Sequence, residues 1–170
     1  MRWIPAALLA CVFLGACAAP EKPPTYLERA NVLPLDLDSR FQIRKQMLFF
    51  NDPRNYQTTQ SEVMRFFRMR MNHGATTPRD IDEVTGNYFT FFWRATERAD
   101  VTVRLEYRQT ALGNYVMAQE RYYPNAKGSY KSEFRVTGDE YLEHGRVSAW
   151  RVLLIVNGRI VAFRQSFMWK

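Results

Sequence analysis

The sequence predicts a mainly β protein that forms a single antiparallel β-sandwich after a less regular N-terminal segment. Two observations predict this class: residues 87–168 contain several short runs in which apolar and polar side chains alternate, and no long helical run separates them. A third is the pair Asn157-Gly158 between two apolar runs, which is typical of a tight hairpin. Six or seven strands at a spacing of about ten residues match an immunoglobulin-like sandwich by strand count alone, and a small β-barrel is the alternative.

The chain begins with the three parts of a secretory signal. Arg2 supplies the positive charge, residues 3–14 are apolar, and Leu14-Gly15-Ala16-Cys17 ends the run. An apolar run of about 12 residues is too short for a transmembrane helix, which needs about 20. The final four residues resemble the lipobox of bacterial lipoproteins, and an ordinary secretory signal is the alternative.

The resemblance to lipoproteins implies that residues 1–16 are removed and that the Cys17 thiol carries a diacylglyceryl group. In that class, an aspartate directly after the cysteine favours the inner membrane, whereas this chain continues with Ala18 and Ala19. We therefore expect a protein that a lipid on Cys17 anchors to the outer membrane, facing the periplasm.

Composition divides the rest of the chain into three parts. Residues 17–34 contain four prolines and are predicted to be an extended tether. Residues 35–62 are predicted to be an irregular segment that packs on the main domain, although Phe41 to Phe50 is apolar enough for a strand or a short helix. Residues 63–170 are predicted to form the sandwich.

The first part of this domain is ambiguous between helix and strand. Thr59 and Glu62 could form a capping box for a helix that ends near Gly74. Against this, Phe67, Met69 and Met71 alternate with arginines, which favours a strand. The strand is the preferred prediction, followed by a loop over residues 73–86.

The later strands are predicted at residues 87–94, 101–108, 115–123, 132–137, 147–156 and 159–168. The last two form the hairpin around Asn157-Gly158, a type I′ turn in which both central residues need positive φ. Trp150 is predicted to anchor the core, and the carboxyl terminus is predicted to be tied into the sheet.

Cysteine usage and charge restrict stability and partners. The chain has two cysteines; Cys11 lies in the predicted signal and Cys17 carries lipid, so disulfides cannot stabilise the mature domain. Its 25 aromatic residues (12 Phe, 9 Tyr, 4 Trp) must supply much of the core. The formal net charge of +7 becomes +6 without Arg2, which favours anionic partners, and the predicted compartment excludes nucleic acid.

The common catalytic patterns are missing from the sequence. It contains no P-loop, GxGxxG, GxSxG, HExxH or CxxC spacing, and we predict neither an enzyme nor a cofactor. His73 and His144 each precede a glycine and are predicted to lie in turns. The cluster Asp139-Glu140-Glu143-His144 matches no metal pattern and is predicted to be a solvated hairpin loop. Asp80, Asp82 and Glu83 lie in the earlier predicted loop, where they could pair with Arg79 or act as acid and base in glycan hydrolysis.

Arginine recurs at predicted outward positions. Aligned on one sheet, such side chains would hold phosphates or carboxylates; paired with glutamates across strands, they would form ordinary ion pairs. The candidate surface for an anionic ligand or a partner comprises Arg94, Arg104, Arg108, Arg151 and Arg164.

The preferred functional hypothesis is a lipid-anchored, non-enzymatic structural or protein-interaction component of the cell envelope. The alternative is a periplasmic binding module for an anionic envelope ligand, such as a lipid phosphate or an acidic glycan. An envelope hydrolase is the third hypothesis, and it requires that the acidic groups meet in one cleft.

Overall fold

The computed structural model describes residues 22–27, 30–55 and 61–169 and confirms a mainly β fold. The predicted signal, Cys17 and Thr59 lie outside these residues. The strands are β1 (Thr25–Leu27), β2 (Phe41–Asn51), β3 (Gly86–Gln109), β4 (Met117–Thr137), β5 (Val147–Val156) and β6 (Arg159–Gln165), and the helices are α1 (Glu62–Met71), α2 (Pro78–Val84) and α3 (Asp139–His144). The strands join one open antiparallel sheet in the order β1-β4-β3-β5-β6, with β2 also paired to β3.

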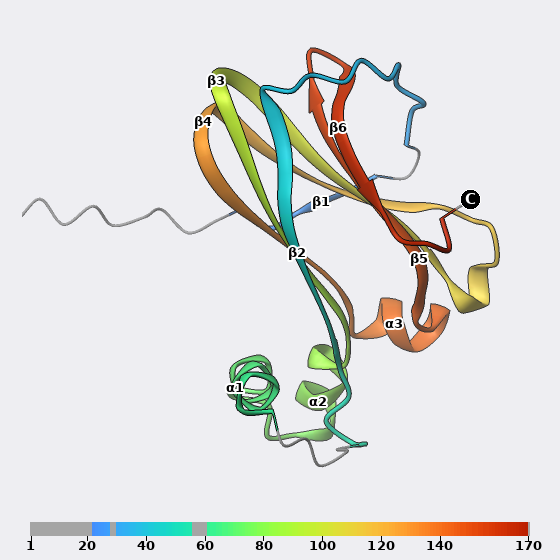
Figure 1. Ribbon diagram of the computed structural model, residues 1–170. Coiled ribbons are helices and arrows are strands. Elements are labelled where there is room, and N and C mark those ends of the chain that lie inside the picture. Colours follow the sequence, from blue (N-terminus) through green and yellow to red (C-terminus); the bar gives the residue numbers. More distant parts are fainter. Residues whose placement is uncertain (1–21, 28–29, 56–60, 170) are drawn as a thin grey trace, which may run out of the picture.

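The sheet is built on one long, bent hairpin of β3 and β4. Pairing between them is irregular from Ala95 to Val101, where Asn125 takes a positive φ of 51° and donates its backbone N–H to Asp100 at 2.8 Å. Strand β2 pairs with β3 before this bend and β5 pairs with it afterwards. The hairpin therefore folds over itself, and the single sheet curls into two facing halves, in keeping with a sandwich or an open barrel (Figure 1).

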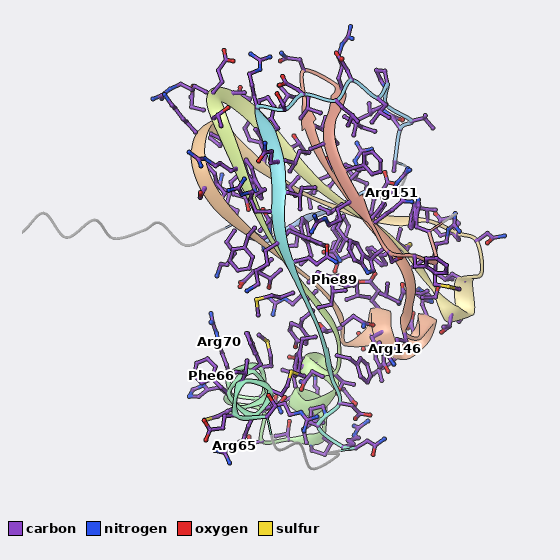
Figure 2. All side chains as sticks on the ribbon, viewed as in Figure 1. Arg65, Phe66, Arg70, Phe89, Arg146 and Arg151 are labelled. Atoms are coloured by element: carbon purple, nitrogen blue, oxygen red, sulfur yellow. The ribbon has the colours of Figure 1, made fainter. Side chains whose placement is uncertain are left out.

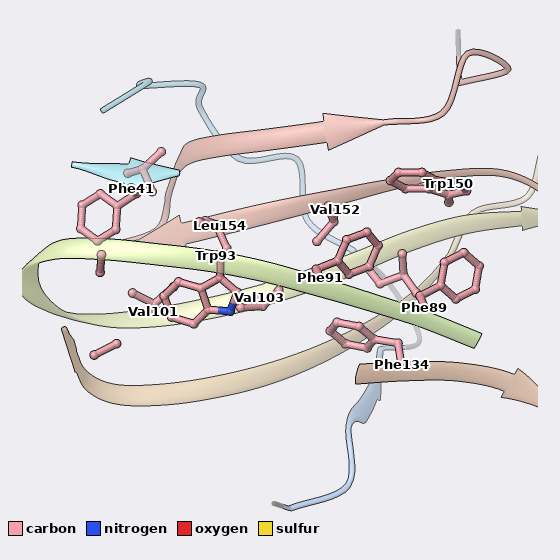
Figure 3. Close-up of a cluster of buried hydrophobic side chains, with 14 of the residues drawn as sticks. Phe41, Phe89, Phe91, Trp93, Val101, Val103, Phe134, Trp150, Val152 and Leu154 are labelled. Atoms are coloured by element: carbon pink, nitrogen blue, oxygen red, sulfur yellow. The ribbon is translucent and has the colours of Figure 1, made fainter. Parts of the chain in front are cut away.

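The core lies between the two halves. Alternating positions of β3 on both sides of the bend point inward and are almost fully buried, and Trp150 of β5 lies 6.3 Å from Phe89 and 5.5 Å from Phe91 between ring centroids (Figure 3). Trp150 is thus a core residue, as predicted. The other large members of this cluster are Phe41, Trp93, Val101, Val103, Leu105, Tyr107, Phe134, Val152 and Leu154.

The hairpin of β5 and β6 is confirmed. Asn157 and Gly158 have φ of 50° and 71°, the positive values that a type I′ turn requires. After β6, the backbone N–H of Ser166 donates to the carbonyl of Trp150 at 2.9 Å, and Trp169 is buried. The end of the described chain is therefore tied to the sheet, as predicted.

The N-terminal segment is held more closely than a free tether would be. Strand β1 pairs with the first part of β4, and residues 34–38 run along β6, with three backbone hydrogen bonds of 2.9 Å. The apolar run of Phe41 to Phe50 is the strand β2. Residues 25–27 and 34 of the predicted tether, and residues 35–38 and 41–51 of the predicted irregular segment, consequently belong to the sheet or cover its edge.

The strand predicted over residues 62–72 is wrong, because this segment is helix α1. Ser61 caps it by accepting the backbone N–H of Met64, Glu62 lies in the first turn, and Arg68 and Arg70 lie in the last. Its methionines, arginines and glutamate favour helix, and none of its residues is buried, so the alternating pattern has no sheet face to fill.

The loop predicted over residues 73–86 contains helix α2. Thr77 and Asp80 form a capping box, and Pro78 occupies the first turn, where its missing N–H has no cost. The acidic segment predicted as a hairpin loop is likewise the short helix α3, which lies between Gly138 and Gly145. All three helices lie at the end of the sheet opposite the β3–β4 bend (Figure 1).

Candidate functional site

Three of the five predicted surface arginines gather on one face of the sheet. Arg104 lies opposite Glu120 and Leu153 in the register of β3 with β4 and β5, and Glu106 lies opposite Arg151. Arg108, two residues further along β3, lies opposite Ala149. Residues that are paired across two strands lie on the same face of a sheet. These three arginines therefore all lie on the outer face of the second half of the sheet, beside two glutamates.

Four of these residues form an ion cluster, defined as Arg104, Glu106, Glu120 and Arg151. Arg104 Nε is 2.6 Å from a Glu120 oxygen, and Arg151 Nε is 2.5 Å from a Glu106 oxygen. Arg104 also lies 3.6 Å from Glu106 and donates to the carbonyl of Asn31 at 3.0 Å. The side chains of Arg104 and Glu106 are only 9% and 4% exposed, so these pairs are largely shielded from water.

The C-terminal segment covers the same face. The Trp169 ring lies 4.8 Å from the guanidinium carbon of Arg108 and 4.9 Å from that of Arg151, within cation–π range. A cavity of about 290 Å³ beside the ion cluster is lined mainly by apolar side chains, including Val32, Leu33 and Phe163. Two arginines and two glutamates balance in charge, so the ion cluster holds the sheet and its covering segments together and presents little excess positive charge.

The other two predicted arginines lie elsewhere. Arg94 is exposed on the first half of β3, opposite Gln42 and Ser129. Arg164 of β6 donates to the side-chain oxygen of Gln46 in β2 at 3.5 Å, across the gap between these strands. The five arginines therefore do not form one continuous basic stripe.

The acidic groups serve local structure. Asp80 caps α2, Asp82 pairs with Arg54 at 2.5 Å, and Glu83 pairs with Arg79 at 3.4 Å. Glu140 of α3 accepts hydrogen bonds from the hydroxyls of Tyr26 and Tyr107. Among the described residues, no group of three or more histidines, cysteines or carboxylates is arranged to hold a metal ion.

Burial and Glu140 change the acidity of these tyrosines. Desolvation raises the pKa of Tyr26 to about 12, and the neighbouring Glu140 carboxylate adds to the effect. The same two causes raise the pKa of Tyr107 well above its usual range. Both hydroxyls therefore stay protonated and keep donating at neutral pH, which ties α3 to β1 and β3.

Both histidines lie at or just after the end of a helix. The prediction that they lie in turns is confirmed for His73 and wrong for His144. His73 is in the turn after α1, whereas His144 is the last residue of α3. Neither belongs to a group with several other ligand-type side chains among the described residues.

A second site, missed by the sequence analysis, is a groove of about 310 Å³ that the end of α1, the start of β3 and both halves of β4 line. Three arginines line it: Arg70 from α1, and Arg121 and Arg135 from β4. Its apolar lining includes Tyr88, Phe89 and Phe134. We call this the arginine groove; it combines an aromatic lining with three positive charges.

Contacts around the arginine groove hold the guanidinium group of Arg121 and reduce opposing charge. Arg121 donates to the carbonyl of Glu133 at 2.6 Å and lies 5.8 Å from the Phe134 ring. Glu133, the one carboxylate among the lining residues, is 2.9 Å from the ammonium of Lys131. The arginine groove therefore differs from the ion cluster, because its positive charge exceeds its negative charge.

Tyr88 lies on the wall of the same groove and is held in place. Its hydroxyl donates to the carbonyl of Val84 at 2.8 Å, and burial raises its pKa to about 12 although Arg135 acts in the opposite direction. Tyr88 is therefore neutral near pH 7, and it adds no negative charge to the wall.

Sequence reasoning missed this groove because it treated β4 as two strands. Arg121 and Arg135 are far apart in a two-strand reading, but the bent β4 brings both to one groove. The signal in the sequence is weak. Arg121 and Arg135 each stand in a run of alternating polar and apolar residues, and a bent hairpin would place these two runs on facing halves of the sheet.

Comparisons with known proteins identify no relative whose site could be compared with this one. No family model, curated protein or solved structure matches this chain. Along the described ranges, no helix has the length and apolar character needed to cross a membrane.

Proposed function

We propose that this protein is a lipid-anchored, non-enzymatic envelope protein that binds an anionic ligand in the arginine groove. The observation that carries the proposal is the excess of arginine over carboxylate around a groove with aromatic walls. Arginine binds phosphate and carboxylate groups through paired, charge-assisted hydrogen bonds, and the aromatic walls suit an apolar part of the same ligand. The ligand class is therefore an amphiphile that carries a phosphate or a carboxylate.

The location rests on Cys17. Lipid on this cysteine would keep the groove close to a membrane, where anionic amphiphiles are concentrated, since two or more acyl chains hold a protein stably at a bilayer. The outer membrane, facing the periplasm, is the proposed site, because Ala18 and Ala19 follow the cysteine in place of an aspartate.

Replacement of Cys17 by alanine tests the anchor. We expect metabolic labelling with a radioactive fatty acid to mark the parent protein and to be lost in Cys17→Ala, because the thiol is the attachment atom. Cys11→Ala is the matched control and should keep the label, since residue 11 lies in the part that is removed. Equal labelling of the parent and of Cys17→Ala would contradict the proposed anchor.

Charge reversal at Arg135 tests the groove. We expect dihexanoyl phosphatidic acid, kept below its micelle concentration, to bind the purified protein, and Arg135→Glu to weaken binding at least tenfold in calorimetric titration. The loss follows because a repulsive carboxylate replaces one of three positive charges. Binding should also weaken as salt is raised.

The matched control for this titration is Arg94→Glu, which makes the same charge change at an exposed site outside the groove. It should alter affinity less than twofold. If Arg94→Glu and Arg135→Glu weakened binding equally, net charge and not the groove would be responsible. The same titration with an oligomer of galacturonic acid, in place of the lipid phosphate, tests whether an acidic glycan supplies the anionic group.

A further inference from the structure

Helix α1 presents an apolar ridge away from the rest of the protein. Val63, Phe66 and Met69 follow one another at intervals of three residues and are 63%, 61% and 67% exposed. Such spacing places them along one side of a helix. The Phe66 ring meets Phe67 edge-on at 6.2 Å, but most of the surface of these three side chains remains open to solvent as one apolar row.

The opposite side of α1 contacts the sheet. The Phe67 ring lies 6.2 Å from that of Phe49 in β2. The buried amide of Asn51 donates to the Asn72 side chain at 2.7 Å and to the carbonyl of Val84 at 2.9 Å, which joins the ends of α1 and α2 to the sheet. The ridge therefore lies on the side of α1 that faces away from the sheet.

Positive charge borders the ridge. α1 contains three arginines and one glutamate, and Arg65 and Arg70 are exposed beside Phe66 (Figure 2). Arginines next to exposed Phe and Met on a short helix are the features of helices that lie in the interface of an anionic bilayer.

The shape of this surface favours a bilayer over a protein partner. Figure 1 shows α1 at the edge of the molecule, beyond the end of the sheet, and the outer side of a single helix is a convex surface. A specific protein interface needs about 800 Å² of complementary surface on each side, which three side chains on a single helix do not provide. A convex row of apolar side chains can instead enter the headgroup region by itself.

We propose that α1 is a second membrane contact, which lays its Val63-Phe66-Met69 ridge into the interface of an anionic lipid bilayer. Lipid on Cys17 would retain the protein at the membrane, and α1 would set the orientation of the domain on it. The inference goes beyond ligand binding in the arginine groove: Val63, Phe66, Met69 and Arg65 do not line that groove, and Arg70 borders both surfaces.

A fluorescent label at position 66 tests this contact. The full chain carrying Phe66→Cys is purified from membranes, labelled with a thiol-reactive bimane and reconstituted into vesicles that contain phosphatidylglycerol and acyl-brominated lipid. We expect quenching by the bromine atoms to be at least threefold stronger than for Arg98→Cys, an exposed position in the bend of β3 at the far end of the sheet. The parent chain, treated in the same way, measures labelling of its own cysteines.

Lipid charge provides the second comparison. Quenching at position 66 should fall at least twofold in vesicles of phosphatidylcholine alone and in Arg65→Glu, and Met69→Cys should repeat the result of Phe66→Cys. Equal quenching at positions 66 and 98 would overturn the proposal, as would cross-linking of position 66 to a protein in native membranes without quenching by lipid. Arg135→Glu should leave quenching at position 66 unchanged, which separates this contact from the arginine groove.

Discussion

Replacement of Trp93 by alanine is expected to lower the free energy of unfolding by roughly 3–5 kcal/mol, the range for removing a large aromatic side chain from a core. Trp93 is 1% exposed, and its ring stacks on Tyr130 at 4.7 Å and meets Tyr123 edge-on at 5.2 Å. Its indole N–H also donates to the Ser132 hydroxyl at 2.9 Å. The substitution therefore leaves a cavity between the two halves of the sheet and removes the donor to a buried hydroxyl.

Equilibrium urea unfolding followed by far-ultraviolet circular dichroism measures this loss. The control is Phe66→Ala, which also removes an aromatic ring but from an exposed position, and it should change stability by less than about 0.5 kcal/mol. A loss below about 1 kcal/mol for Trp93→Ala would show that Trp93 is not closely packed.

Replacement of Glu106 by glutamine is expected to cost roughly 3 kcal/mol, because it removes one carboxylate from a buried set of charges. Glu106 lies within ion-pair distance of both Arg104 and Arg151. Glutamine has nearly the same shape, so the loss reports charge and not packing. Arg104, the more buried of the two arginines, would keep only Glu120 as an acidic partner within the ion cluster.

The same urea measurement, with Glu97→Gln as the control, tests the importance of burial. Glu97 also pairs with an arginine, Arg40, but both side chains are more than half exposed. Exposed pairs contribute at most about 1 kcal/mol, so this control should have a small effect. Equal losses in the two variants would contradict the view that burial gives the ion cluster its strength.

Local patterns predicted the β elements well wherever a strand has one buried face. The alternation in residues 101–108 predicts the inner face of the second half of β3, and Asn157-Gly158 predicts the last turn. The continuity of β3 and β4 was missed, because the irregular pairing near Ala95 and Asn125 resembles a turn between separate strands.

The error at α1 has a physical cause. Alternation of Phe67, Met69 and Met71 with arginines predicts a strand only if one face is buried, and whether it is buried depends on distant residues such as Phe49. Intrinsic helix preference and the Ser61 cap decide the outcome at this exposed site. At α2, Thr77, Pro78 and Asp80 are a local signal for the start of a helix, which the prediction of a loop did not include.

The candidate sites could be predicted only in part. The possibility of cross-strand pairs between arginines and Glu106 or Glu120 follows from strand alternation, and such pairs occur in the ion cluster. The arginine groove could not be derived in this way, because it requires the bend of β4 and the placement of α1, both of which are set by tertiary packing.

The contact of residues 34–38 with β6 has a consequence for the order in which the protein assembles. The β3–β4 hairpin closes over residues 110–116, so its two strands need only a short loop to meet. The edge of β6, in contrast, gains its neighbour from a segment near the start of the described chain, and Leu35 meets Ile160 only when the strands between them have been brought together. The segment that covers this edge is therefore expected to be among the last parts of the fold to find its place.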